Sequence, residues 1–173
     1  MNPGQTRICI VGGLGHIGLP LGIMFADAGF HVTLLDSNRK NFDLVLRGEL
    51  PFVEYGAEPL LATALEKGLL HLSDSYSSLG EADVAIVCIG TPVDEYMSPI
   101  LAPFLQCIED ISNNIKKETL VVIRSSVYPG SFQRISGILA EKAIHNVSYC
   151  PERIVQGYAV KEIKNLQIGR AHV

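Results

Sequence analysis

Six glycine-rich residues near the N-terminus carry the strongest chemical signal in the sequence. Residues 13–18 read Gly-Leu-Gly-His-Ile-Gly and follow the apolar run 8–11, which is typical of a buried strand. Residues 19–28 continue with the pattern of a helix. The spacing G-x-G-x-x-G between a strand and a helix is the fingerprint of dinucleotide binding. The alternative is a glycine-rich turn in an α/β protein of another kind.

Each glycine of this motif has a physical reason. Gly13 allows the tight turn off the strand, Gly15 lets the backbone approach a pyrophosphate, and Gly18 lets the helix pack close to the strand. The backbone N–H groups of His16 and Ile17 then lie at the helix N-terminus, where the helix dipole favours phosphate. The motif therefore predicts a phosphate site built from backbone.

An acidic residue follows at the distance that this kind of site requires. The second predicted strand ends in Asp36, which is 23 residues after Gly13. An acid about 20 residues on binds the adenosine ribose hydroxyls of NAD, and its charge repels the 2′-phosphate of NADP. Arg39 and Lys40 lie nearby and favour the opposite choice, and an ordinary strand-end aspartate is the alternative. We expect NAD as the cofactor.

The elements that must position these residues alternate along the chain. Apolar runs predict strands at 7–12, 30–35, 69–72, 82–89, 120–123 and 147–150. Periodic apolar patterns predict helices at 16–28, 39–47, 57–67, 100–115 and 132–143. This alternation predicts an α/β fold of the Rossmann type, a doubly wound parallel sheet of six strands in the order 3-2-1-4-5-6, in three α/β/α layers.

Polar residues stand where three further strands end, and the carboxyl ends of parallel strands form the ligand edge of such a sheet. Thr91 and Pro92 follow one strand, Ser126 follows the next, and Glu152 follows the last. The hydroxyls of Thr91 and Ser126 are expected to line the nicotinamide side of the cofactor. The alternative is that both hydroxyls only satisfy local backbone in turns.

Composition narrows the function classes. The chain has 173 residues, a net charge of −4 and no long basic run, which argues against nucleic acid as a partner. No apolar stretch reaches about 18 residues, so no membrane span is expected. The first residues lack a signal-peptide pattern. The four cysteines have neither metal-site nor redox spacing, which predicts no metal and a reduced, cytoplasmic protein.

Four stretches, spread along the chain, together resemble the UDP-glucose/GDP-mannose dehydrogenase family. They are residues 11–20, 90–94, 124–130 and 149–157. The last stretch begins Tyr-Cys-Pro-Glu-Arg, which is most similar to the branch that oxidises UDP-N-acetylmannosamine and UDP-N-acetylglucosamine. The chain is similar to the N-terminal NAD-binding domain of that family.

The resemblance implies an NAD-dependent 6-dehydrogenase that oxidises the C6 alcohol of a UDP-sugar to a carboxylate with two NAD⁺. It implies that Glu152 handles protons or water near the reacting carbon and that Ser126 lies at the reacting end of the cofactor. It also implies that Arg153 and Ile154 contact the nucleotide sugar, and that Pro92 belongs to the cofactor site. Full-length members of the family are homo-oligomers.

The sequence departs from the family pattern in several places. The catalytic cysteine, lysine and asparagine of the family fall beyond residue 173, so the chain alone is expected to be inactive. His16 stands where many members have tyrosine, and Ser126 where many have threonine. We interpret residues 1–168 as the NAD-binding domain and residues 169–173 as a short tail. The residues of this tail do not continue the Gly-Gly run of the family, which leaves a non-native origin open. We expect the chain to lack the substrate and C-terminal domains of the family. Another Rossmann oxidoreductase, or a non-catalytic dinucleotide-binding module, is the alternative.

Overall fold

The chain folds around a single parallel sheet, as the alternation of its elements predicts. The computed structural model describes residues 2–93, 95–96 and 100–165. The sheet has six strands in the order β3-β2-β1-β4-β5-β6, and every pairing is parallel. The strands are β1 (Arg7–Val11), β2 (His31–Leu35), β3 (Leu70–Ser73), β4 (Val84–Val87), β5 (Leu120–Ile123) and β6 (Val147–Tyr149). The Rossmann-type fold is thereby confirmed.

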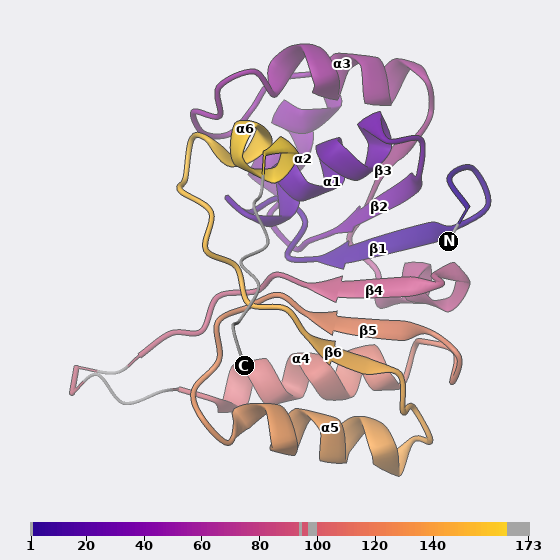
Figure 1. The fold of residues 1–173 in the computed structure, drawn as a ribbon, viewed down its shortest axis with the longest axis vertical. Coiled ribbons are helices and arrows are strands. Elements are labelled where there is room, and N and C mark those ends of the chain that lie inside the picture. Colours follow the sequence, from indigo (N-terminus) through magenta and orange to yellow (C-terminus); the bar gives the residue numbers. More distant parts are fainter. Residues whose placement is uncertain (1, 94, 97–99, 166–173) are drawn as a thin grey trace.

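Helices cover the sheet in two layers (Figure 1). They are α1 (Gly18–Asp27), α2 (Arg39–Leu46), α3 (Glu58–Glu66), α4 (Ala102–Ser112), α5 (Ser131–Glu141) and α6 (Ala159–Lys164), with a 3₁₀ helix η1 (Tyr76–Glu81) before β4. Leu19, Ile23 and Leu61 join the core on one face of the sheet. Phe104 and Ile135 join the core on the other face. All four residues of β4 are buried, as expected of a central strand covered on both sides.

The boundaries differ from the expected ones in ways that have local causes. The helix expected at 16–28 begins only at Gly18, because residues 12–17 form the turn that leaves β1. The strand expected at 82–89 shortens to β4, and η1 and α6 were not expected at all. Both missed elements have six residues, too few to give a periodic apolar pattern.

The start of α6 is fixed by a residue from a distant part of the chain. The Glu54 carboxylate accepts hydrogen bonds from the backbone N–H groups of Gly157 (3.1 Å) and Val160 (3.2 Å). Glu54 is buried with 4% of its surface exposed. A helix N-terminus leaves N–H groups without intrahelical partners, and a buried carboxylate needs donors, so each satisfies the other. Helix α6 therefore depends on a tertiary contact.

The turn from β1 into α1 is packed too tightly for side chains. Gly12 has a left-handed φ of +79°, so it is the residue at which the chain reverses. A Cβ on Gly13 would lie 2.8 Å from the Leu34 Cα of the neighbouring strand β2. A Cβ on Gly18 would lie 2.3 Å from the Gly12 carbonyl oxygen. Gly18 is therefore required by its contact with the turn itself rather than with a strand, the sharp turn belongs to Gly12, and Gly13 is required by its contact with β2.

We expect Gly13→Ala to lower the free energy of unfolding by about 1–3 kcal/mol, the usual cost of forcing an extra carbon into a packed interior. Chemical denaturation measures this change. Gly137→Ala is the matched control, because Gly137 is in α5 and its added Cβ meets nothing within 4 Å. That variant should gain up to about 1 kcal/mol from helix propensity. Equal effects of the two substitutions would contradict the packing argument.

Candidate cofactor site

The glycine turn presents free backbone donors at the carboxyl end of β1. Neither the His16 N–H nor the Ile17 N–H takes part in a backbone hydrogen bond within the described residues. A Cβ on Gly15 would meet only the Gly12 carbonyl oxygen, at 3.5 Å, so the space in front of Gly15 is open. Two free N–H groups beside an open glycine, at the start of a helix, suit a phosphate group.

Asp36 lies beside this turn and is already partly bound to it. Its carboxylate accepts hydrogen bonds from the backbone N–H groups of Leu14 and Asn38, each at 3.0 Å. An ionised carboxylate has about four acceptor positions, so two remain for further donors such as ribose hydroxyls. Asp36 therefore holds the glycine turn against the end of β2 and keeps the capacity to bind a ligand.

Two cavities flank the glycine turn along this edge of the sheet. The smaller one, about 140 Å³, is lined by Asp36 together with Gly12, Tyr76, Ile89 and other residues of the β1, β2 and β3 ends. The larger one, about 380 Å³, lies on the β4 and β5 side. Ile89 lines both. An elongated ligand such as a dinucleotide can therefore cross the turn with one end in each cavity.

The larger cavity brings together seven of the residues singled out from the sequence. They are Gly15, His16, Ile17, Thr91, Ser126, Glu152 and Ile154. They come from four separate stretches of the chain, and the glycine turn faces the end of β6 across the cavity. The other expected residues lie elsewhere. Gly13 and Gly18 are buried inside the turn, and Pro92 is exposed and lines neither cavity of the turn.

Arg153 faces a different space from Glu152, although the two are neighbours in sequence. It lines a third cavity of about 740 Å³ with Tyr158, Lys161 and Asn165. Glu152 and Ile154 line both this cavity and the one beside the glycine turn. Glu152 therefore stands on the boundary between two spaces that a cofactor and a second ligand can occupy.

The hydroxyl groups at the strand ends have two different roles: two of them bond to backbone, and one is open to the cavity. The Thr91 hydroxyl donates to the Ser126 carbonyl oxygen at 3.0 Å. Its proton therefore satisfies a backbone group, which was the alternative to a role in cofactor binding. The Ser125 hydroxyl is buried and donates to the Ile89 carbonyl oxygen at 2.7 Å. Ser126 is exposed at the cavity. Thr91 and Ser125 thus join the ends of β4 and β5, and Ser126 offers its hydroxyl to the cavity.

Glu152 is held by donors from three residues. Its carboxylate forms an ion pair with Arg124, and its Oε1 accepts from the backbone N–H groups of Arg153 (2.6 Å) and Ile154 (2.9 Å). The side chains of Arg124 and Glu152 are only 18% and 9% exposed. Arg124 also donates to the Cys150 carbonyl oxygen at 3.1 Å. The orientation of the carboxylate is therefore fixed by the ends of β5 and β6 together.

Three residues of this region were missed by the sequence analysis: Glu54, Arg124 and Asp74. Arg124 is part of the family stretch 124–130, but the sequence analysis gave it no role, because its partner Glu152 lies far away in the chain. Glu54 and Asp74 follow apolar or turn segments with no motif of their own. A contact across 103 residues, as between Glu54 and Gly157, leaves no pattern in a single sequence.

Burial keeps most of the thiols protonated. Cys9 is buried and Cys88 is half-buried, and desolvation raises the pKa of each thiol to about 12. Burial also raises the pKa of Cys107. Cys150, which falls within the strand expected at 147–150, is instead exposed just after β6, because the strand ends at Tyr149. Cys88 lines the cavity beside the glycine turn, but a protonated thiol is a poor nucleophile.

The sheet order, the glycine turn and the acidic residue at the end of β2 define a dinucleotide-binding domain of the Rossmann class. Residues 6–170 match the model of the UDP-glucose/GDP-mannose dehydrogenase family, NAD binding domain. The chain therefore belongs to this family, and its cofactor is NAD.

Individual relatives agree with this assignment. A UDP-N-acetyl-D-mannosamine dehydrogenase of Methanococcus maripaludis is 33% identical over 161 residues, which cover 91% of this chain and 36% of the relative. A protein of the same name from Salmonella typhimurium is 31% identical over 174 residues, covering 92% of this chain and 40% of the relative. The chain thus spans well under half the length of the curated relatives it matches.

Solved structures agree as well. The structure of a UDP-D-ManNAc dehydrogenase from Pyrococcus horikoshii superposes with a TM-score of 0.84 at 27% identity, over 91% of this chain and 39% of that one. A GDP-mannose dehydrogenase from Pseudomonas aeruginosa, solved as a ternary complex, gives 0.82 at 26% identity, over 91% and 38%. Both the fold and the family are therefore supported by independent comparisons.

Within residues 2–93, 95–96 and 100–165, no helix combines the length and the apolar character needed to cross a bilayer.

We expect Cys150 to react with iodoacetamide at pH 8 at least about a hundredfold faster than Cys88, since only thiolates react and the Cys88 pKa of about 12 leaves almost none. The rate at Cys88 should still rise as the pH increases above 9, because the pKa of this thiol is about 12. Peptide mass spectrometry measures both rates. In guanidinium chloride the two rates should converge, and equal rates in the folded protein would contradict the burial argument.

Proposed function

We propose that this chain is the cofactor-binding part of an NAD-dependent nucleotide-sugar 6-dehydrogenase. The observation that carries the proposal is the meeting of Glu152 and Ile154, from the end of β6, with the glycine turn across one cavity. A Rossmann site for NAD alone needs the turn and the acid after β2. A fixed carboxylate facing the same cavity adds a group that can exchange protons with a substrate.

In this proposal the cofactor lies along the carboxyl edge of the sheet. The N–H groups of His16 and Ile17 bind its pyrophosphate beside Gly15, with Gly13 and Gly18 shaping the turn. Asp36 binds the adenosine ribose in the smaller cavity. Bound NAD⁺ supplies the hydride acceptor. These contacts fit the open space at Gly15 and the spare acceptor capacity of Asp36.

The remaining residues are assigned to the reacting end. Ser126 and Thr91 line the nicotinamide side, with Pro92 beside Thr91, and Ser126 offers a hydroxyl close to the reaction. Glu152, oriented by Arg124 and by two backbone N–H groups, accepts the proton that leaves the alcohol as hydride departs. A positioned base of this kind is typically worth about 10²–10⁴ in rate.

The proposed substrate is a UDP-sugar, with UDP-N-acetylmannosamine and UDP-N-acetylglucosamine favoured. Arg153 and Ile154 are assigned to the nucleotide sugar, in the cavity of about 740 Å³ that Glu152 also borders. Arg153 and Lys161 bring positive charge to that cavity, beside the Arg124–Glu152 ion pair and Glu162, and their donors suit a diphosphate. The relatives named for UDP-N-acetyl-D-mannosamine support the choice of sugar.

We expect Gly15→Val to abolish the enhancement of NADH fluorescence while leaving the thermal transition close to that of the parent. The valine side chain fills the space that the pyrophosphate needs, yet its Cβ contacts the protein only at 3.5 Å. Gly137→Val on the far helix α5 is the control and should bind NADH normally. Binding that survives in Gly15→Val would mean that the phosphates do not lie at this turn.

We expect this chain alone, given NAD⁺ and UDP-N-acetylmannosamine, UDP-N-acetylglucosamine or UDP-glucose, to produce no sustained NADH absorbance. The first oxidation needs the sugar alcohol to be oriented against the nicotinamide, which supplies much of the rate, and this chain spans only 36% of the length of the Methanococcus maripaludis relative. The second oxidation, of aldehyde to acid, needs a nucleophile, and the Cys88 thiol at the cavity stays protonated. Sustained turnover would show that the reacting groups have been wrongly placed.

A chimaera tests the proposed reaction directly. Residues 1–165 are joined to the remaining part of the Methanococcus maripaludis relative, and NADH is counted per sugar oxidised. We expect two NADH per UDP-sugar, and a rate about a hundredfold lower for Glu152→Gln with little change in NAD⁺ affinity. Glu141→Gln, at the exposed end of α5, is the control. A chimaera that binds NADH and oxidises none of the three sugars would refute the proposal.

A further inference from the structure

We propose that Asp74 is a second determinant of cofactor choice, because it holds Arg39 in an ion pair and so denies a cation to the 2′-phosphate of NADP. The proposal rests on the assignment of the smaller cavity to the adenosine end of NAD. It concerns a residue that has no place in the glycine motif and lies on a different strand end from Asp36.

Asp36 and Asp74 lie side by side at the edge of the sheet. Asp36 follows β2, Asp74 follows β3, and the two strands pair with Leu35 opposite Ser73. The backbone N–H of Asp36 donates to the Ser73 carbonyl oxygen at 3.0 Å, which joins the two strand ends directly. Both aspartates line the same cavity of about 140 Å³. A ligand in that cavity therefore meets two carboxylates.

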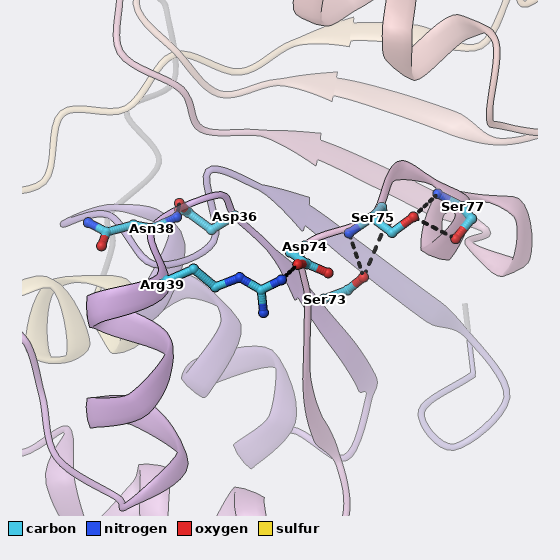
Figure 2. A network of polar contacts seen from close by, with 7 residues as sticks. All are labelled: Asp36, Asn38, Arg39, Ser73, Asp74, Ser75 and Ser77. Atoms are coloured by element: carbon cyan, nitrogen blue, oxygen red, sulfur yellow. Dashed lines mark hydrogen bonds and ion pairs between the residues drawn. The ribbon is translucent and has the colours of Figure 1, made fainter.

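Arg39 is the cation of the polar network drawn in Figure 2, and it is already bound to Asp74. It stands at the first position of α2, and its guanidinium forms an ion pair and hydrogen bond with the Asp74 carboxylate. The same guanidinium carbon lies 5.6 Å from the centre of the Phe42 ring. Asp74 and Phe42 thus both hold Arg39 in place.

The turn that carries Asp74 is itself fixed by hydrogen bonds. The Ser73 hydroxyl donates to the Ser75 carbonyl oxygen and accepts from the Ser75 N–H, both at 3.2 Å. The Ser75 hydroxyl in turn accepts from the Ser77 N–H at the start of η1 (Figure 2). Asp74 lies between these bonds, so its backbone has a defined position at the end of β3.

The charges around the smaller cavity disfavour the 2′-phosphate of NADP. A phosphate monoester carries close to two negative charges at pH 7, and guanidinium groups bind it through paired hydrogen bonds. At this site the phosphate would meet Asp36, Asp74 and an arginine whose charge Asp74 already neutralises. Without Asp74 the same arginine is free to bind the phosphate. Arg39, which by sequence alone favours NADP, is thereby converted into part of an NAD site.

The test compares four forms of the chain by calorimetry with NAD⁺ and NADP⁺ at low salt. They are the parent, Asp74→Asn, the double variant Asp74→Asn/Arg39→Gln, and Glu49→Gln. The last is the matched control, since it breaks another exposed arginine–carboxylate pair, that of Arg47 and Glu49. Exposed ion pairs contribute little to stability, so all four forms should fold, and thermal melting checks this.

We expect Asp74→Asn to raise NADP⁺ affinity about tenfold, the size of one charge-assisted hydrogen bond, with NAD⁺ affinity within about twofold of the parent. The gain should disappear in the double variant and shrink as salt is added, because salt screens exposed charges. Glu49→Gln should match the parent.

Two results would overturn the inference while NAD⁺ binding stays intact. One is an unchanged NADP⁺ affinity in Asp74→Asn, and the other is a gain that persists without Arg39. A parent chain that binds no NAD⁺ gives a different failure, because it would remove the cofactor site itself and the inference with it.

Discussion

The structure depends on the close packing of one glycine turn against three strands. Gly12 reverses the chain where an added Cβ would lie 2.7 Å from the Cys88 carbonyl oxygen, just after β4. Gly13 lies against Leu34 of β2, and Gly18 brings α1 onto the end of β1. The absence of side chains at these points lets the N-terminus of α1 reach the carboxyl edge of the sheet. The phosphate site is therefore a product of backbone packing.

Carboxylates then connect this turn to the rest of the edge. Asp36 bonds the turn to the end of β2, and Glu152 is fixed between β5 and β6 by Arg124. Glu54 ties the loop before α3 to the segment that follows Glu152, while Phe52 of the same loop packs on His16 with ring centres 4.0 Å apart. The two walls of the larger cavity are thus joined through residues 52–54. In each case the carboxylate accepts hydrogen bonds from two backbone N–H groups.

The chain belongs to the NAD-binding domain family of the UDP-glucose/GDP-mannose dehydrogenases, so these contacts are interpreted together as parts of one NAD site. In the proposed site the adenosine end of the cofactor lies over β2 and β3, where Asp36 and Asp74 line the smaller cavity. The proposed reacting end lies over β4, β5 and β6, where hydroxyls and one fixed carboxylate meet. The division follows from the sheet order, because β1 and β4 are adjacent and their connections leave on opposite faces.

The sequence by itself determined the alternation of strands and helices and the position of the glycine turn, because these follow from local spacing and apolar runs. The strand order followed from the fold class that this alternation predicts, and the family from the resemblance of four stretches. It also placed Asp36, Ser126 and Glu152 at strand ends. Only the tertiary structure decided what those side chains contact. The pairing of Glu152 with Arg124, of Arg39 with Asp74, and the capping of α6 by Glu54 each join residues far apart in the chain. Such pairs form because folding brings unsatisfied charges and N–H groups together at one edge, and no local pattern records which partner each will meet.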